Sequence, residues 1–328
     1  MKSTTSKKSL KRSRNIMIKV SIAIVVLLLV GSIGIGAFLF NYAIVRKPPL
    51  SNDTANMRNQ ISITMAQSRI DGKAWMDENK MEKMQITAQD GVALTGYFLG
   101  SSEETKKLAI LIHGHRSNLT MMGNYAKFYY EQGFNIFMAD SRGHGESGGD
   151  YVGMGWLDRL DYLVWLDALI AKTGMDSQII LHGVSMGASA AMMIGGEENL
   201  PSQVKCIIED CGYTSVYDEF LYQVKELFHL PSFPILNIGN LACRSLAGFS
   251  FEEASALEQV KKTKLPIFFI HGDADIYNPT EMVYELYGTA GGEKELWVVP
   301  GAEHGMAFYT MPEEYINRVE SFYEKYIY

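Results

Sequence analysis

The sequence predicts an α/β protein whose mostly parallel central sheet is flanked by helices. From about residue 81 onward, short apolar runs alternate with stretches that have helical spacing. Several of these runs end in a polar residue or glycine, as buried strands do at a functional edge. The composition, 47% hydrophobic and 20% charged, is that of a globular protein with a sizeable core. Together these observations favour a sheet covered by helices on both faces.

One N-terminal transmembrane helix is predicted to precede this domain. Residues 20–40 carry no charge, and at 1.5 Å per residue they span about 30 Å, the thickness of a bilayer core. Seven basic residues precede this run, and only Arg46 and Lys47 follow it closely. The positive-inside rule then predicts a basic cytoplasmic tail at 1–19, a signal-anchor at 20–45, and an extracellular remainder of a single-pass cell-membrane protein. The alternative is a cleaved signal peptide and a secreted product.

Residues 46–75 are predicted to be a tether and lead-in, and residues 76–328 the globular domain. The net charge of the whole chain is −7, but nine of its 30 basic residues lie before residue 48 and all 37 acidic residues lie after it. The remainder therefore carries a net charge of −16, which argues against a nucleic-acid partner. Three cysteines are too few for a disulfide scaffold and lack metal-site spacing. The sequence does not indicate the oligomeric state.

The expected elements follow one another along the chain. Asp90-Gly91 lies between two strand-like runs and marks a hairpin. A helix is expected over residues 156–171, where apolar residues recur on one side. The other expected strands are 108–112, 134–139, 179–181, 206–208, 267–270 and 296–299, and the other expected helices are 185–194 and 313–326.

A nucleophile is indicated by Gly183-Val184-Ser185-Met186-Gly187, which matches G-x-S-x-G. An apolar strand precedes the motif and a helix start follows it, so Ser185 lies on a tight strand-to-helix turn. Glycines are required there because side chains would clash in such a turn. The helix N-terminus behind Ser185 favours developing negative charge.

A serine nucleophile needs a base, and the base needs an orienting acid. In strand–turn–helix sites the order along the chain is serine, acid, histidine. His304 follows the last strand-like run and is the predicted base. Asp275 is the predicted acid; Asp273 and Asp210, which also follow strands, are the alternatives.

These motifs resemble the α/β-hydrolase superfamily, in its membrane-anchored bacterial serine-hydrolase branch, from about residue 85 to residue 326. The resemblance rests on His113-Gly114, on the loop 140–147, on the elbow, on His271-Gly272-x-x-Asp275, and on Gly301-x-x-His304-Gly305. It implies an oxyanion hole made by the backbone N–H groups of His115 and Met186. It also implies that the aromatic segment 212–264 is a helical cap insertion over the site. Asn278, where the family often has valine, and the bulky pair His115-Arg116 depart from the family pattern.

The expected function is hydrolysis of carboxylic esters, small or lipid-like, through an acyl-enzyme formed on a Ser185–His304–Asp275 triad. No cofactor and no metal are expected. The alternatives are a peptidase, thioesterase or acyltransferase with the same triad, or a non-catalytic extracellular binding protein on this fold.

Overall fold

A single eight-stranded sheet forms the centre of the protein in a computed structural model that describes residues 3–48 and 60–328. Its strands are β1 (Glu82–Thr87), β2 (Ala93–Leu99), β3 (Lys107–Ile112), β4 (Asn135–Ala139), β5 (Gln178–Val184), β6 (Val204–Asp210), β7 (Ile267–Gly272) and β8 (Lys294–Val299). The spatial order is β1-β2-β4-β3-β5-β6-β7-β8. The β1/β2 and β2/β4 pairs are antiparallel, and every other pair is parallel. The predicted α/β-hydrolase fold with a mostly parallel sheet is confirmed.

Alternation along the central strands places successive side chains on opposite faces of the sheet. In β3, Ile110 and Ile112 belong to one hydrophobic cluster, whereas Ala109 and Leu111 belong to the other. All four side chains are fully buried, because helices cover both faces. The continuous apolar run that predicted this strand is therefore the signature of a strand buried on both sides.

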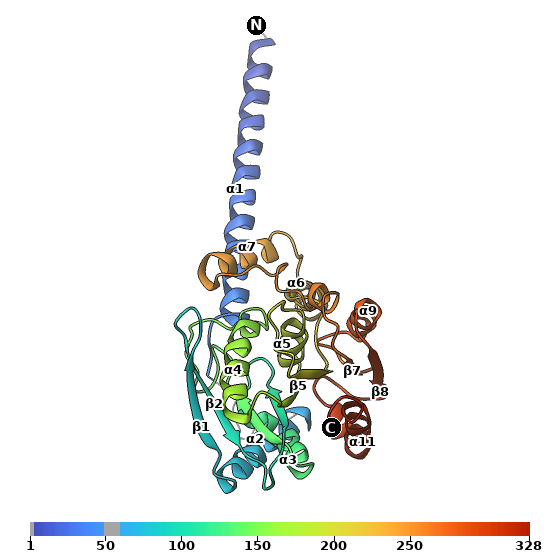
Figure 1. Ribbon diagram of the computed structural model, residues 1–328. Coiled ribbons are helices and arrows are strands. Elements are labelled where there is room, and N and C mark those ends of the chain that lie inside the picture. Colours follow the sequence, from blue (N-terminus) through green and yellow to red (C-terminus); the bar gives the residue numbers. More distant parts are fainter. Residues whose placement is uncertain (1–2, 49–59) are drawn as a thin grey trace.

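Helices cover the two faces as separate sets (Figure 1). The first cluster contains residues of α4 (Asp158–Thr173), α5 (Met186–Gly195), α8 (Ala256–Val260) and α9 (Glu281–Thr289). The second contains residues of α3 (Gly123–Glu131) and α11 (Pro312–Tyr323). Two short helices, η2 (Leu119–Met122) and α10 (Ala307–Thr310), lie beside this second set.

Between β6 and α8 the chain forms a helical cap made of α6 (Val216–Tyr222), η3 (Gln223–Leu227), α7 (Ile235–Ala242) and η4 (Cys243–Ala247). These elements fall inside the insertion predicted at 212–264. All three cysteines are buried and free, Cys211 and Cys243 included.

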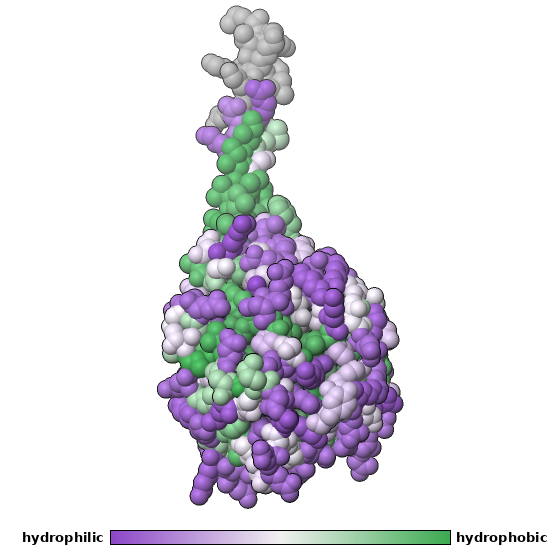
Figure 2. Space-filling view, in the orientation of Figure 1, coloured by the Kyte–Doolittle hydropathy of each residue, from purple (hydrophilic) through white to green (hydrophobic). Residues whose placement is uncertain are grey.

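The N-terminal helix α1 (Ser3–Ala43) projects from the body beside α7 (Figure 1). Its segment from Arg14 to Ala43 is the one helix of the described residues that is long and apolar enough to cross a membrane, and 6% of its most apolar window is buried. Figure 2 shows this stretch as an apolar column above a largely polar body. Such a helix is consistent with a signal-anchor or a signal sequence.

A second helix, α2 (Gln60–Glu78), begins in the segment 46–75 that we predicted to be a tether and lead-in, and it ends just inside the predicted domain. It packs against η2 and α3, where Gly72 and Gly123 face each other. A Cβ on Gly123 would lie 2.1 Å from the Cα of Gly72, so the two backbones are in direct contact. The sequence did not indicate this helix, because its apolar residues are not gathered on one face.

Candidate active site

Ser185 occupies the tight turn between β5 and α5. Its backbone has a φ of 58° and a ψ of −120°, a strained conformation for a residue with a side chain. The turn is possible because Gly183 and Gly187 lack side chains. A Cβ on Gly183 would lie 2.0 Å from the carbonyl oxygen of Gly187, and one on Gly187 would lie 2.0 Å from that of Ile112. The motif therefore forces the serine hydroxyl outward at the carboxyl edge of the sheet.

His304 lies between this hydroxyl and a carboxylate. Its Nε2 is 2.8 Å from the Oγ of Ser185, and its Nδ1 is 2.7 Å from the Oδ2 of Asp275. The ring nitrogen that faces a carboxylate carries the proton, so Nδ1 donates to Asp275. Nε2 is then free to accept the hydroxyl proton of Ser185. The structure thus brings the three predicted side chains, which lie in three separate loops, into one hydrogen-bonded chain.

The carboxylate of Asp275 is held from both sides. Its Oδ1 accepts hydrogen bonds from the backbone N–H groups of Tyr277 and Asn278, at 2.8 and 2.9 Å. His271 lies on the other side, with its Nε2 3.4 Å from Oδ2. Burial opposes ionisation, but the imidazoles of His304 and His271 outweigh it and hold the pKa of Asp275 well below its usual value. Asp275 is therefore a fixed anion behind His304.

The two alternative acids have other partners. Asp273 accepts the backbone N–H of Gly301 at 2.6 Å and so braces the loop that carries His304. Asp210 is buried, accepts the hydroxyl of Tyr315 at 2.9 Å, and has its pKa raised to about 6 by burial. Neither carboxylate is hydrogen-bonded to a histidine of the described chain.

The loop after β3 lies against Ser185. A Cβ on Gly114 would lie 3.2 Å from the Cβ of Ser185. Since the Nε2 of His113 accepts the N–H of Ser141 at 3.0 Å, its Nδ1 carries the proton and donates to the carbonyl oxygen of Gly114 at 2.8 Å. In a trans peptide the N–H points opposite to the C=O. The N–H of His115 is therefore directed away from His113.

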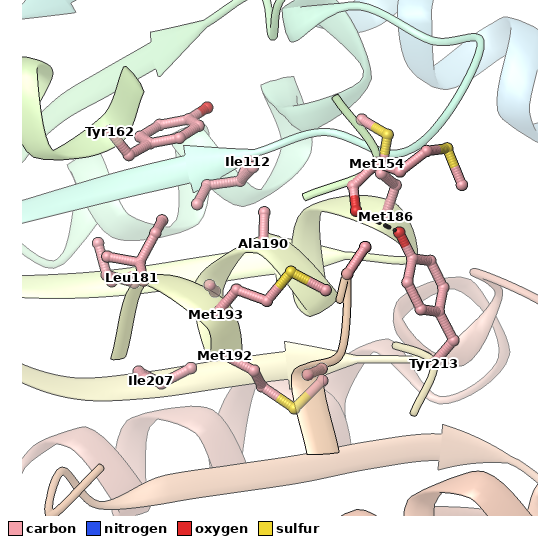
Figure 3. Packing of buried hydrophobic residues seen from close by; sticks show 14 of the residues in the cluster. Ile112, Met154, Tyr162, Leu181, Met186, Ala190, Met192, Met193, Ile207 and Tyr213 are labelled. Atoms are coloured by element: carbon pink, nitrogen blue, oxygen red, sulfur yellow. Dashed lines mark hydrogen bonds between the residues drawn. The ribbon is translucent and has the colours of Figure 1, made fainter. Parts of the chain in front are cut away.

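Met186 supplies the second predicted donor group. It is the first residue of α5, and its buried side chain lies near Met154 and Tyr213 in the first hydrophobic cluster (Figure 3). Neither the N–H of Met186 nor that of His115 donates a hydrogen bond within the described part of the chain. Both backbone donors are thus unoccupied beside the serine turn.

Two features that border the site were not predicted from the sequence, the side-chain contact of His115 and the position of Glu219. The Nε2–H of His115 donates to the carbonyl oxygen of Ala43, at the end of α1, with a separation of 2.8 Å. Burial lowers the pKa of His115 to about 4, so the ring is neutral. Glu219, on cap helix α6, has its pKa raised to about 8 by burial and by the negative charge of Asp275. No spacing in the sequence signals these contacts, because they depend on how the cap and α1 pack.

Cys211, Asp275 and His304 are a group of described residues with the ligand types of a metal site, and their ligand atoms lie within 4.8 Å of one another. Two of them are already hydrogen-bonded to each other, and burial raises the pKa of the Cys211 thiol well above its usual value. A metal there would have to displace the bond between Asp275 and His304. The donor set therefore fits the Ser–His–Asp chain better than a cation.

Comparison with known proteins finds relatives and solved structures that match most of this chain. Residues 103–229, which include Ser185, match the family described as serine aminopeptidase, S33. The Bacillus subtilis protein YqkD is 28% identical over 245 residues, covering 74% of this chain and 80% of that protein. The Escherichia coli O157:H7 protein YfhR is 27% identical over 232 residues, covering 69% and 74%. A solved structure of the Pyrococcus furiosus esterase Pf2001 has a TM-score of 0.62 and 25% identity, covering 77% and 95%. The chain has the α/β-hydrolase fold, and it is similar to proteins of the serine aminopeptidase S33 and esterase-like families.

Proposed function

We propose that this protein is a membrane-anchored serine hydrolase that cleaves carboxylic esters through an acyl-enzyme on Ser185. The proposal rests on one observation above all, the continuous hydrogen-bonded chain Ser185–His304–Asp275 with separations of 2.8 and 2.7 Å. The esterase Pf2001, which shares the fold, makes ester substrates the first class to test.

In the proposed reaction the Nε2 of His304 takes the proton of Ser185 while the serine oxygen attacks the ester carbonyl. Asp275 keeps His304 in the accepting tautomer and stabilises the imidazolium that forms. The tetrahedral intermediate collapses, His304 protonates the departing alcohol, and the acyl group remains on Ser185. A water molecule, deprotonated by His304, then attacks the acyl-enzyme and releases the acid.

The developing oxyanion is assigned to the backbone N–H groups of His115 and Met186. Both are free of other acceptors within the described residues, and both flank the serine turn. The start of α5 adds the positive end of its helix dipole. In comparable sites one such donor contributes roughly 3–4 kcal/mol to the stability of the transition state.

We further propose that α1 retains the enzyme as a single-pass protein of the cell membrane, with its N-terminus cytoplasmic and the catalytic domain outside. The support is the apolar stretch between Arg14 and Ala43 and the excess of basic residues before it. Fractionation combined with protease protection tests this orientation. A domain degraded only after membrane lysis would contradict it.

The catalytic assignment is tested by labelling the full-length protein with a fluorophosphonate. We expect one labelled site, Ser185, and no label in Ser185→Ala. Ser202→Ala, at an exposed serine outside the site, is the matched control and should label like the unchanged protein. If Ser185→Ala still takes the label or still hydrolyses 4-nitrophenyl acetate, the assignment is wrong.

An aminopeptidase is the second candidate, favoured by the family match and by Glu219. The Oε1 of Glu219 accepts a hydrogen bond from Gln223 at 3.1 Å, but its buried Oε2 has no partner in the described chain. An ammonium group of a substrate would satisfy that oxygen and favour its ionised form. Comparing kcat/KM for aminoacyl-4-nitroanilides and 4-nitrophenyl esters decides between an aminopeptidase and an esterase. The thioesterase alternative is tested by adding a thioester substrate to this comparison. The acyltransferase alternative is tested by adding an acceptor alcohol.

A further inference from the structure

The end of α1 is joined to the body rather than free. Arg46, three residues beyond the helix, donates from its guanidinium to three carbonyl oxygens of the segment 145–149, at 2.7, 2.8 and 3.3 Å. Next to it, Val45 pairs with Tyr151 as an isolated β-bridge. Ile44, one residue earlier, is fully buried. The last turn of α1 is therefore fixed relative to the catalytic domain.

Two residues of this last turn contact the loop after β3, which carries one of the two proposed oxyanion donors. The Nε2–H of His115 donates to the carbonyl oxygen of Ala43 at 2.8 Å. The guanidinium of the next residue, Arg116, lies over the ring of Tyr42, with its Cζ 5.2 Å from the ring centroid. His115 and Arg116 are the bulky pair that departs from the family pattern. The departure thus coincides with contacts to a helix that precedes the hydrolase domain.

These contacts act on a tight turn. The N–H of Ser117 donates to the carbonyl oxygen of Gly114 at 3.3 Å, so His115 and Arg116 are the two central residues of the turn. Arg116 has a φ of 54°, in the left-handed region that a residue with a long side chain seldom occupies. Its N–H donates to the Nε2 of His144 at 3.1 Å. Such a backbone persists only where the surroundings hold it, and here the side chains of both central residues contact α1.

The direction of the His115 N–H depends on this turn. The N–H belongs to the peptide group between Gly114 and His115, whose carbonyl oxygen accepts the Nδ1–H of His113 at 2.8 Å. The opposite end of that peptide group is the N–H that we assign to the oxyanion at Ser185. The nitrogen is bonded to the Cα of His115, and the ring on that residue is fixed to Ala43. The peptide group is therefore held at its oxygen end by the end of β3 and at its nitrogen end by α1.

We propose that the end of α1 positions the oxyanion hole, through the hydrogen bond from His115 to Ala43 and the contact of Arg116 with Tyr42. The side chain of His115 is then a positioning residue, in addition to the donor role proposed for its backbone. This proposal rests on the proposed serine-hydrolase function, which it deepens by making catalysis depend on the N-terminal helix. Loosening α1 from the body leaves the triad in place and weakens the stabilisation of the transition state.

The first test replaces the ring of His115 in the full-length protein. His115→Gln keeps an N–H donor near the end of the side chain, whereas His115→Met has a similar length and no donor. We expect His115→Met to lower kcat for 4-nitrophenyl acetate about tenfold and to leave KM within about twofold, because a misdirected N–H weakens binding of the oxyanion and not of the substrate. His115→Gln should stay within about threefold of the unchanged protein.

The second test links this effect to α1. Arg46→Ala releases the end of α1 from the segment 145–149, and it should lower kcat by about threefold to tenfold. Because both changes act through one contact, the variant with Arg46→Ala and His115→Met should lose about as much as His115→Met alone. Lys47→Ala, at the neighbouring basic residue, is the matched control and should leave kcat unchanged.

The rate of fluorophosphonate labelling gives a readout that does not depend on the choice of ester. The phosphoryl oxygen of the reagent takes the place of the oxyanion when Ser185 attacks, so the labelling rate should fall in parallel with kcat. The final number of labelled sites counts folded active sites, and it should be the same in every variant. A loss of labelled sites that accounts for the loss of kcat would show a folding defect and overturn the positioning role.

Three other results would contradict the proposal. They are a His115→Met protein that keeps its kcat and labelling rate, an Arg46→Ala protein that keeps both, and losses that multiply in the double variant. The proposed function fails in a different way. If the unchanged protein is labelled at Ser185 but cleaves no ester, the esterase function is wrong, and the labelling rates of the same variants still decide the positioning role. If the unchanged protein takes no label, both proposals are wrong.

Discussion

Replacing Asp275 with asparagine separates the role of its charge from the role of its shape. The Oδ1 of Asp275 accepts two backbone N–H bonds, from Tyr277 and Asn278. In Asp275→Asn the amide oxygen must keep that position, because an NH₂ group there would face two donors. The amide NH₂ then takes the place of Oδ2 and points at the Nδ1 of His304.

His304 must respond by carrying its proton on Nε2, the atom that lies 2.8 Å from the Oγ of Ser185. A protonated Nε2 donates to the serine and cannot accept its proton. We therefore expect kcat for 4-nitrophenyl acetate to fall about 10⁴-fold, which corresponds to about 5.4 kcal/mol of lost transition-state stabilisation. Steady-state kinetics and a thermal melt of the same preparation measure the loss and show that the fold persists.

Asp273→Asn is the matched control. Asp273 accepts one N–H, from Gly301, and an amide oxygen accepts it equally well. Activity within about threefold of the unchanged protein is expected, on the scale of a surface substitution. The reasoning is refuted if Asp275→Asn keeps more than a tenth of the activity, or if Asp273→Asn loses as much as Asp275→Asn.

Three further predictions concern stability. Gly187→Ala should give no folded protein, because its Cβ would lie 2.0 Å from a backbone oxygen. Gly288→Ala, in open space on α9, is the control and should raise the melting temperature slightly. Equal yields and melting temperatures of the two variants would contradict this prediction. Arg46→Ala should lower the free energy of unfolding by about 2 kcal/mol, because it loses hydrogen bonds to three carbonyl oxygens. Lys47→Ala is the control and should change the free energy of unfolding very little. Equal melting temperatures of the two variants would show that α1 is not held by Arg46. Burial and the charge of Asp161 raise the pKa of Asp158 to about 7. Between about pH 4 and pH 7 the folded protein therefore keeps a proton on Asp158 that the unfolded chain has released. The contribution of Asp158 to the free energy of unfolding falls as pH rises through this range. Asp158→Asn should flatten that slope by up to about 1.4 kcal/mol per pH unit, and an unchanged slope in melts at several pH values would contradict the assignment.

The sheet and the candidate site could be predicted because their signals are local in the sequence. A strand buried on both faces is a continuous apolar run, as 108–112 shows, and Ser185 is flanked by the two glycines that its turn needs. The loops after β7 and β8, which carry Asp275 and His304, meet because parallel strands end at one edge of the sheet. Separating Asp275 from Asp273 required the resemblance to a family, since both follow the same strand.

The parts that were not predicted depend on contacts between distant segments. In the sequence Arg46 is simply a basic residue next to a predicted membrane helix. No residue near it in the chain indicates that its guanidinium donates hydrogen bonds to three carbonyl oxygens of residues 145–149. Helix α2 likewise has no apolar stripe, and it is stabilised by the contact between Gly72 and Gly123. A pairing of glycines 51 residues apart leaves no local pattern, so only the tertiary structure reveals it.

The fixed end of α1 has a consequence for how the enzyme meets its substrate. An anchor joined through a flexible tether would let the domain turn, and the site would sample the aqueous phase as readily as the bilayer. Here Ala43 is bonded to His115 at the carboxyl edge of the sheet, the edge that also carries Ser185. If α1 spans the membrane as we propose, that edge faces the bilayer in every molecule. Substrates that partition into the membrane are then presented to Ser185 at high local concentration, whereas soluble esters must diffuse between the cap and the lipid surface.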